Sequence, residues 1–142
     1  MSFKRKALAW GLGLFLLLAL VPGVLAQEVT VQVSEHPELG TILTDGEGMT
    51  LYMYTRDEEN VSNCYDQCAV NWPPLLVGEG SEPVAGEGLT GELGVIDRTD
   101  GGRQVTYNAM PLYYWLQDSQ PGDATGQGVG GAKGQGLPDI GF

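Results

Sequence analysis

The residues of this chain that could carry chemistry lie mainly in two copies of one phrase, L-Y-x-[Y/W]-x-x-D, at positions 51–57 and 112–118. The copies contribute Tyr52, Tyr54 and Asp57, and Tyr113, Trp115 and Asp118. Aromatic rings of this kind stack on sugars or protein partners, and two carboxylates can hydrolyse a glycosidic bond if their separation is right. The structural alternative is that the rings pack together across an internal symmetry axis while the aspartates cap turns.

The motif predicts which rings share a face. Alternate side chains of a β-strand point the same way, so Tyr52 and Tyr54 form one pair, and Tyr113 and Trp115 form the other. We favour the structural interpretation for these pairs, because aromatic residues dominate small cores. If the rings bind a ligand instead, the best candidates are Tyr54, Trp72 and Trp115.

The two cysteines are spaced as Cys64-x-x-x-Cys68. A pair four residues apart can form a disulfide when the segment is a helical turn or a tight loop. A zinc site would need four ligands, and this chain offers only the cysteine pair and one distant histidine. We therefore predict a local disulfide.

Soft metal ligands are present but scattered. His36, Met49, Met53 and Met110 are weak candidates for copper(I), because thioether and imidazole suit that ion. Calcium would require six to eight oxygens, and the available carboxylates follow no known calcium spacing; they are Asp97, Asp100, Asp118 and Asp123. We expect no metal and no cofactor.

Catalysis is also not expected. The chain has no G-x-S-x-G elbow, its single histidine lies in an irregular stretch, and both thiols are assigned to the disulfide. The machinery of nucleophile and base is therefore missing, and we predict that the protein is not an enzyme.

Short runs between glycine-rich turns favour strands over helices. In the first half we expect an edge strand at 29–33, a hairpin whose strands at 41–44 and 49–55 flank the turn at 45–48, one or two helical turns within 63–70, and an acidic linker at 78–91. Trp72 should end the helical segment, because a residue before proline avoids the α conformation.

The sequence of the second half predicts strands at 93–98, 103–108 and 111–117, with a turn at 99–102. The sequence after Asp118 is glycine-rich, and we expect loops docked by a few apolar side chains, namely Val129, Leu137, Ile140 and Phe142. The fold class is therefore mainly β with small α content: a single compact domain of two pseudo-repeated antiparallel β units, with a short helical turn at the cysteine pair.

Residues 1–26 have the pattern of a secretory signal peptide, with three basic residues, an apolar run and small residues before Gln27. After cleavage, four basic and 18 acidic residues would remain, for a formal net charge of −14. Such a chain repels nucleic acid and anionic lipid. We expect a secreted or periplasmic protein without membrane insertion after cleavage, and its partner would be an unknown envelope or extracellular molecule.

The motif copies, the segment N-C-Y-D-Q-C-A-V-N-W-P-P-L-L at 63–76 and the segment R-Q-V-T-Y-N-A-M-P-L-Y at 103–113 together resemble a bacterial family of secreted repeats of unknown function. Its members are often described as predicted lipoproteins with a Y-x-[FWY]-x-x-D motif. The resemblance implies an extracytoplasmic tandem-repeat module and transfers no catalytic residues. This chain lacks the cysteine that anchors many members to lipid, which favours free secretion or a periplasmic location.

The resemblance leads to a domain plan. After the signal peptide we expect a duplicated domain at 27–130, with repeat one at about 40–77 and repeat two at about 93–130, and then a glycine-rich tail at 131–142. The G-Q-G-V segment at 126–129 continues into glycines, so the closing strand of repeat two is predicted to be absent or replaced by a partner. The expected function is a non-catalytic binding or structural module; the alternative is a periplasmic metal-handling protein for copper or calcium.

Overall fold

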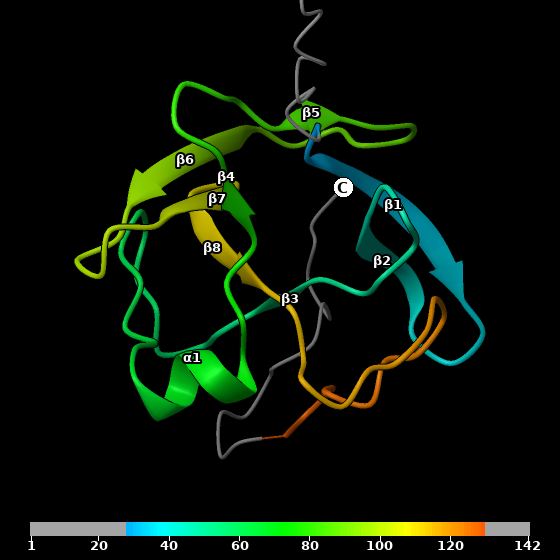
Figure 1. Cartoon of the computed structure of the whole chain (residues 1–142). Coiled ribbons are helices and arrows are strands. Elements are labelled where there is room, and N and C mark those ends of the chain that lie inside the picture. Colours follow the sequence, from blue (N-terminus) through cyan, green and yellow to red (C-terminus); the bar gives the residue numbers. More distant parts are fainter. Residues whose placement is uncertain (1–27, 130–142) are drawn as a thin grey trace, which may run out of the picture.

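Two similar antiparallel hairpins form the two halves of the molecule. The computed structural model describes residues 28–129. In the first half, β1 (Thr30–His36) pairs with β2 (Gly40–Asp45), and in the second half β6 (Leu93–Asp97) pairs with β7 (Arg103–Tyr107) (Figure 1). The registers correspond, because Val33 lies opposite Leu43 in one hairpin and Val95 lies opposite Val105 in the other. The expected duplication of an antiparallel β unit is confirmed.

The two copies of the motif pair with each other at the junction of the halves. The first copy contains β3 (Tyr52–Met53) and the second begins with the last two residues of β8 (Met110–Tyr113), and these strands are antiparallel with Tyr52 opposite Tyr113. Within each half, the strand that carries the motif also meets the second strand of its own hairpin, through the pairs Thr44–Thr50 and Thr106–Pro111. The motif strands therefore join the repeats to one another.

The predicted hairpin of residues 41–44 and 49–55 is only partly present. The turn at 45–48 forms, because the Asp45 carboxylate accepts hydrogen bonds from the backbone N–H groups of Glu47 and Met49, both at 2.9 Å. Beyond the turn, only one bridge and the bond from Leu51 N to Leu43 O connect the two strands. β2 pairs along its length with β1, and β3 pairs with β8, because tertiary pairing overrides the local hairpin.

Part of repeat one is inserted between two strands of repeat two. Residues 73–77 lie between β7 and β8 and include β4 (Leu76–Val77), which is antiparallel to β7. The N–H of Leu75 donates to the carbonyl of Leu112, and its carbonyl accepts from the N–H of Val105, each at 2.9 Å. Repeat two therefore depends on a segment of repeat one for part of its backbone hydrogen bonding.

The prediction of an edge strand at 29–33 was wrong, and the segment at 78–91, which joins the two repeats, contains a short strand that was not predicted. β1 is central, since it pairs with β2 on one side and, in parallel, with β5 (Val84–Ala85) on the other. Two of the glycines that suggested a linker allow this close approach: a Cβ at Gly86 would lie 2.6 Å from the Cβ of Gln32, and one at Gly88 would overlap Val33.

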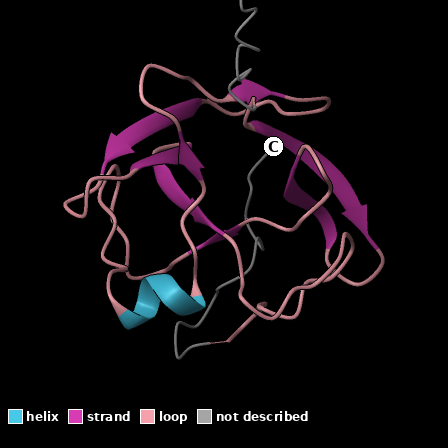
Figure 2. Cartoon of the chain, viewed as in Figure 1, coloured by secondary structure: helices cyan, strands magenta, loops and turns pink. Residues whose placement is uncertain are grey.

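The segment around the cysteines forms as predicted. Helix α1 (Gln67–Asn71) is the one helix within residues 28–129 (Figure 2). It ends at Trp72, whose non-helical backbone precedes Pro73, while its N–H still donates to the carbonyl of Cys68 at 2.7 Å. A disulfide joins Cys64 to Cys68, with their Cα atoms 5.2 Å apart.

Two cores lie on opposite faces of the β3–β8 junction. The aliphatic core contains Leu51 and Leu112 with side chains from β1, β2, β4 and β7, and Met53 and Tyr114 pack against it. The aromatic core is centred on Tyr52 and Tyr113. The alternation expected for the motif is confirmed in both copies.

Some predictions concern parts of the chain outside residues 28–129. These are the signal peptide at 1–26, the tail at 131–142 and the docking of Leu137, Ile140 and Phe142. Over the described range, no helix has the length and apolar character needed to cross a membrane.

Candidate functional site

The motif tyrosines and aspartates exchange hydrogen bonds between the repeats. The Tyr52 hydroxyl of repeat one donates to Oδ2 of Asp118 in repeat two, at 2.5 Å. Reciprocally, the Tyr113 hydroxyl of repeat two donates to Oδ2 of Asp57 in repeat one, at 2.6 Å. Each repeat therefore supplies the hydroxyl donor for the motif aspartate of the other repeat.

The second oxygen of each motif aspartate holds the loop that follows it. Oδ1 of Asp57 accepts from the N–H of Asn63 at 2.7 Å. Oδ1 of Asp118 accepts from the N–H of Thr125 at 2.9 Å and from its hydroxyl at 2.7 Å. The predicted capping role is confirmed, whereas the bonds to tyrosine across the junction were not foreseen.

The aromatic rings of the motif pack with Trp72. Tyr52 meets Trp72 edge-on with centroids 5.4 Å apart, and Trp72 lies 4.2 Å from Trp115. Tyr54 meets Tyr113 edge-on at 6.3 Å. These separations lie in or close to the range in which aromatic pairs attract one another beyond their buried area.

Burial corrects the proposed ligand-binding set. Tyr54 is 9% exposed and Trp72 is 5% exposed, so neither ring offers a face to a ligand. Trp115 is half-buried, and its Nε1 has no hydrogen-bond partner among the described residues. The rings are therefore mainly a core and not an open stacking platform.

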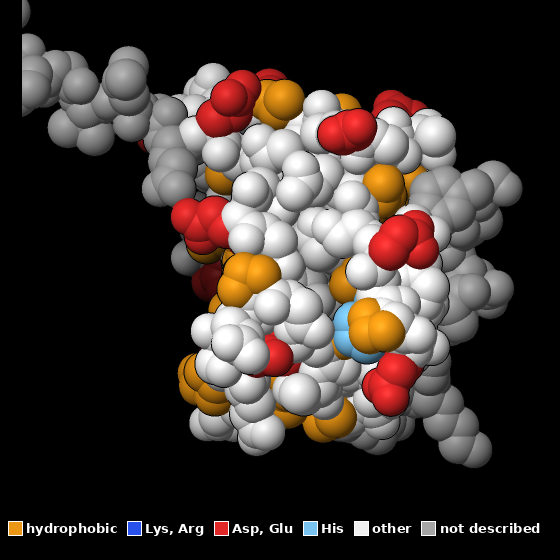
Figure 3. Space-filling model, turned by 90° about the vertical axis from the view of Figure 1, so that its right-hand side faces the viewer, with side chains coloured by type: hydrophobic (Ala, Val, Ile, Leu, Met, Phe, Trp, Pro, Cys, Tyr) orange, Lys and Arg blue, Asp and Glu red, His pale blue; other side chains and the backbone are white. Residues whose placement is uncertain are grey.

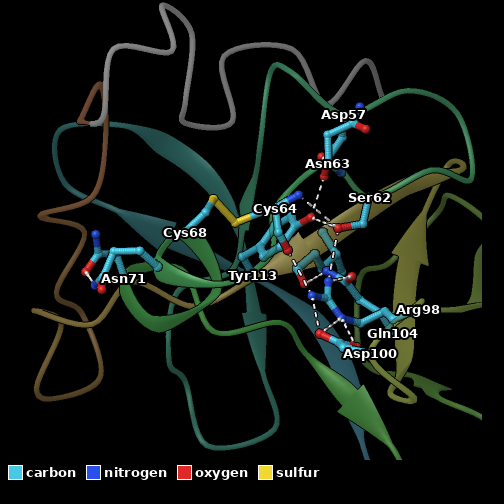
Figure 4. Close-up of a disulfide and its surroundings, with 12 residues drawn as sticks. Asp57, Ser62, Asn63, Cys64, Cys68, Asn71, Arg98, Asp100, Gln104 and Tyr113 are labelled. Atoms are coloured by element: carbon cyan, nitrogen blue, oxygen red, sulfur yellow. Dashed lines mark hydrogen bonds and ion pairs between the residues drawn. A yellow bond between two sulfur atoms is a disulfide. The ribbon is translucent and has the colours of Figure 1, made fainter.

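A buried arginine network adjoins this core and was missed from the sequence (Figure 4). The Arg98 guanidinium, with its side chain 1% exposed, donates to the Ser62 hydroxyl at 3.0 Å, to the Gln104 side-chain carbonyl at 2.8 Å and to the Cys64 backbone carbonyl at 2.8 Å. It also binds both carboxylate oxygens of Asp100, with a closest distance of 2.8 Å. The charge is thus fully hydrogen-bonded, as a buried arginine requires.

The network continues to the motif. The Ser62 and Tyr113 hydroxyls lie 2.7 Å apart, and because Tyr113 already donates its one proton to Asp57, Ser62 is the donor in this pair. A chain of bonds therefore runs from Asp100 through Arg98, Ser62 and Tyr113 to Asp57. Gln104 is fully buried, but it lies on the strand face opposite Val105 and Tyr107, so its polarity in the sequence did not reveal the network.

The electrostatics of the network reflect burial. Burial raises the pKa of Asp57, against the opposing effects of its hydrogen bonds from Tyr113 and Asn63 and of the nearby charge of Arg98. The hydrogen bond from Arg98 lowers the pKa of Asp100. Burial disfavours the charge of Arg98, but its bonds to Asp100 outweigh this effect and raise its pKa. Burial therefore disfavours the ionised form of Asp57, while the hydrogen bonds from Tyr113 and Asn63 hold its carboxylate in place.

A third tyrosine–aspartate pair lies on the other face of the junction. The Tyr114 hydroxyl donates to Oδ2 of Asp45 at 2.9 Å. Burial, reinforced by hydrogen bonds to carboxylates, raises the pKa values of Tyr52, Tyr113 and Tyr114 well above the ordinary value. These three hydroxyls therefore stay protonated in the folded chain at pH values at which solvent-exposed tyrosines begin to ionise.

The weak metal candidates have other roles or are dispersed. Nδ1 of His36 accepts from the N–H groups of Glu38 and Leu39, both at 3.2 Å, so the ring caps the β1–β2 turn. The stretch expected to be irregular at His36 is therefore the end of β1 and a tight turn. Met53 packs against the aliphatic core. Among residues 28–129 no three His, Cys, Asp or Glu side chains cluster as metal ligands would, and the metal-handling alternative is not supported.

The calcium candidates are engaged as well. Asp100 binds Arg98, and Asp118 holds Tyr52 and Thr125. Asp123 accepts from the backbone N–H groups of Ser119 and Gln120, which lowers its pKa. Asp97 lies 3.9 Å from Arg103 and is exposed.

The fold and the site define a duplicated, disulfide-linked β module whose repeated motif bonds across the two halves. Comparison with protein families agrees: the model of the family described as "Secreted repeat of unknown function" matches residues 35–76 and 94–134, more than half of the chain. The chain belongs to this family. No curated protein and no solved structure matched it.

Removal of the Tyr113 hydroxyl should destabilise the protein more than removal of the Tyr52 hydroxyl. Tyr113→Phe leaves Oδ2 of the buried Asp57 without its donor and should cost about 2–3 kcal/mol; Tyr52→Phe should cost about 1–2 kcal/mol, because Asp118 is half-exposed. Urea denaturation measures both. Tyr65→Phe is the control, since its hydroxyl only accepts a long bond of 3.4 Å, and it should change the free energy of unfolding by less than about 0.5 kcal/mol. Equal effects for all three variants would contradict the role assigned to the exchange.

Replacement of Arg98 by lysine should be costly even though the charge is kept. A lysine cannot reproduce the planar fork that serves Ser62, Gln104 and Asp100, so Arg98→Lys should cost about 3 kcal/mol. The exposed Arg56→Lys is the matched control and should be nearly neutral. Thermal and urea unfolding measure the difference, and a neutral Arg98→Lys would show that the network contributes little.

Stability should fall in alkali. Above pH 10 the unfolded chain loses tyrosine protons that Tyr52, Tyr113 and Tyr114 retain in the folded state, so the stabilisation that is complete below the ordinary pKa is lost as the pH rises. Each tyrosine contributes at most about 1.4 kcal/mol per pH unit. In urea unfolding between pH 9 and 11.5, Tyr114→Phe should therefore show a shallower decline than the wild type. Parallel curves would exclude a raised pKa for Tyr114.

Proposed function

We propose that the protein acts outside the cytoplasm as a non-catalytic module that contacts an envelope or extracellular partner through its surface. One observation carries this proposal: the residues of the repeated motif are used to hold the two repeats together. Tyr52 and Tyr113 each donate to the aspartate of the other repeat, and both oxygens of each aspartate are occupied. The motif therefore serves as architecture.

The state of the reactive side chains supports the absence of catalysis. Cys64 and Cys68 are bonded to each other, and His36 caps a turn. Asp57 and Asp118, the pair considered for glycoside hydrolysis, accept hydrogen bonds from tyrosines and loop N–H groups. A general acid or base needs a proton-transfer path to a substrate, and these carboxylates are directed toward protein donors.

The extracytoplasmic location rests on three independent features. The family is described as secreted. The disulfide is of a kind that persists in oxidising compartments. The sequence at 1–26 has the pattern of a signal peptide.

The charge of the surface suggests the chemistry of the partner. Residues 28–129 contain three arginines, and one of them, Arg98, is buried. The face in Figure 3 carries scattered acidic side chains and no visible lysine or arginine. Such a surface favours a basic partner and disfavours nucleic acid.

The proposal is tested in two steps with the natural full-length gene. Cells should release a protein that begins at Gln27, contains the disulfide and lies outside the cytoplasm; a reduced cytoplasmic protein that retains residues 1–26 would overturn the location. The purified protein should then bind isolated envelope material in a salt-sensitive way, because exposed charges are screened by salt.

Variants separate surface binding from binding by the motif. Glu58→Gln with Glu59→Gln neutralises two exposed side chains and should weaken retention. Trp115→Phe, which alters the most exposed ring of the motif pairs, should leave retention unchanged at temperatures where the variant is folded. Loss of retention in Trp115→Phe alone would show that the motif binds the partner directly and would overturn the architectural role.

A further inference from the structure

A tight turn lies at the surface of repeat one, between the first motif copy and the cysteines. Glu58 and Val61 exchange backbone hydrogen bonds at 3.1 and 2.9 Å, so Glu59 and Asn60 form the tip of the turn. The Asn60 N–H donates to the carbonyl of Ala109 at 2.7 Å, which fixes the tip against the turn between β7 and β8. All four residues of the turn in repeat one are exposed.

Asn60 begins an N-x-S sequence. It is followed by Val61 and Ser62, whereas the other three asparagines of the chain have no serine or threonine two residues later. In secreted chains, N-x-[S/T] with x other than proline is the acceptor sequence for N-linked glycans. Glu58, two residues before Asn60, adds an exposed carboxylate that a cationic group of a transferase can bind. The sequence therefore offers one acceptor asparagine.

The contacts of the Asn60 side chain agree with this role. Nδ2 of Asn63 donates to the Arg56 carbonyl at 2.7 Å, and Oδ1 of Asn108 accepts from the Glu92 N–H at 2.9 Å. The Asn60 side-chain amide makes no such bond to another residue of the range 28–129. Its backbone has φ of 58°, a conformation that asparagine and glycine tolerate. The turn thus uses the backbone of Asn60 and leaves its amide in solvent.

The surface beside Asn60 has room for a sugar. A hollow of about 220 Å³ adjoins the asparagine, and its wall includes Glu92, Thr106 and Asn108 of repeat two. Carboxylate, hydroxyl and amide groups can hydrogen-bond the hydroxyls of a sugar. The first sugar of a glycan on Asn60 therefore finds polar partners there without displacement of a core residue.

We propose that Asn60 carries an N-linked glycan, transferred from a polyprenyl diphosphate-linked oligosaccharide by a membrane oligosaccharyltransferase. Nδ2 of Asn60 forms a bond to the anomeric carbon of the sugar, and the bond from that carbon to the diphosphate oxygen breaks. The electron pair of the broken bond leaves with the diphosphate, the amide nitrogen loses one proton to a base, and nothing is oxidised or reduced. The proposal rests on the extracytoplasmic location proposed for the protein, because N-x-[S/T] is an acceptor in secreted chains.

The burial of Ser62 sets the order of events. Its hydroxyl belongs to the acceptor sequence, so the transferase must reach it together with the Asn60 amide. In the folded protein Ser62 is 6% exposed, and its hydroxyl is bonded to Arg98 at 3.0 Å and to Tyr113 at 2.7 Å. Transfer therefore precedes closure of the Arg98 network, and the finished domain hides the serine while the glycan stays at the surface.

Mass spectrometry of the protein secreted by its natural cells tests the modification. The tryptic peptide of residues 57–98 contains Asn60 and should be heavier than its sequence by the mass of a glycan, which fragmentation should place on Asn60. Asn60→Gly suits the same backbone conformation and should fold, but it should lose the added mass. Asn63→Gln is the matched control from the same loop and should keep it.

Two results would contradict the modification in different ways. A secreted chain that begins at Gln27 and carries an unmodified Asn60 would overturn the glycan while leaving the location intact. A chain that stays in the cytoplasm with residues 1–26 attached would overturn the location and, with it, the glycan.

A second measurement tests the order of transfer and folding. Membranes of the same cells, which contain the donor and the transferase, are incubated either with a peptide of residues 56–66 or with unmodified folded protein from a host without the transferase. The peptide should be labelled at least about tenfold faster, because Ser62 of the folded protein becomes accessible only through local opening. Equal rates for the two acceptors would overturn transfer before folding.

Discussion

The exchange of hydrogen bonds between Tyr52 and Asp118 and between Tyr113 and Asp57 is the interaction on which the remaining structure depends. A carboxylate next to a buried aromatic core is unfavourable unless a donor reaches it. The donor here comes from the other repeat, so the two motif strands must lie side by side in one register. This requirement places β3 against β8 and thereby sets the relation between the halves.

From this junction the rest of the packing follows. One face carries the aliphatic core and the other the aromatic core, because the residues of the motif alternate. The disulfide fixes the loop that brings Cys64 and Trp72 to the aromatic face, and Arg98 ties the same loop to β6 and β7. The buried charge of Arg98 is stable because all of its N–H donors have acceptors. Since all of these bonds must form together, the network requires one arrangement of its side chains.

The burial of the motif shows that its residues serve the architecture of the molecule. A repeated aromatic and acidic motif on a secreted module suggests a binding surface, yet its tyrosines and aspartates face inward and bind one another. The halves differ at the cysteine loop, which repeat one alone carries.

Features that depend on local or periodic signals were predictable from the sequence. The duplication, the β class, the disulfide with its short helix and the facing of the motif rings follow from spacing, alternation and the conformational limits of proline. The capping role of Asp57 and Asp118 was likewise local. Three features became visible only in the folded chain: β1 is central, Gly86 and Gly88 permit a parallel strand beside it, and Arg98, Ser62 and Tyr113 form one buried chain of bonds. These contacts join residues far apart in sequence, and their partners are set by long-range strand pairing, which leaves no periodic signal in the chain.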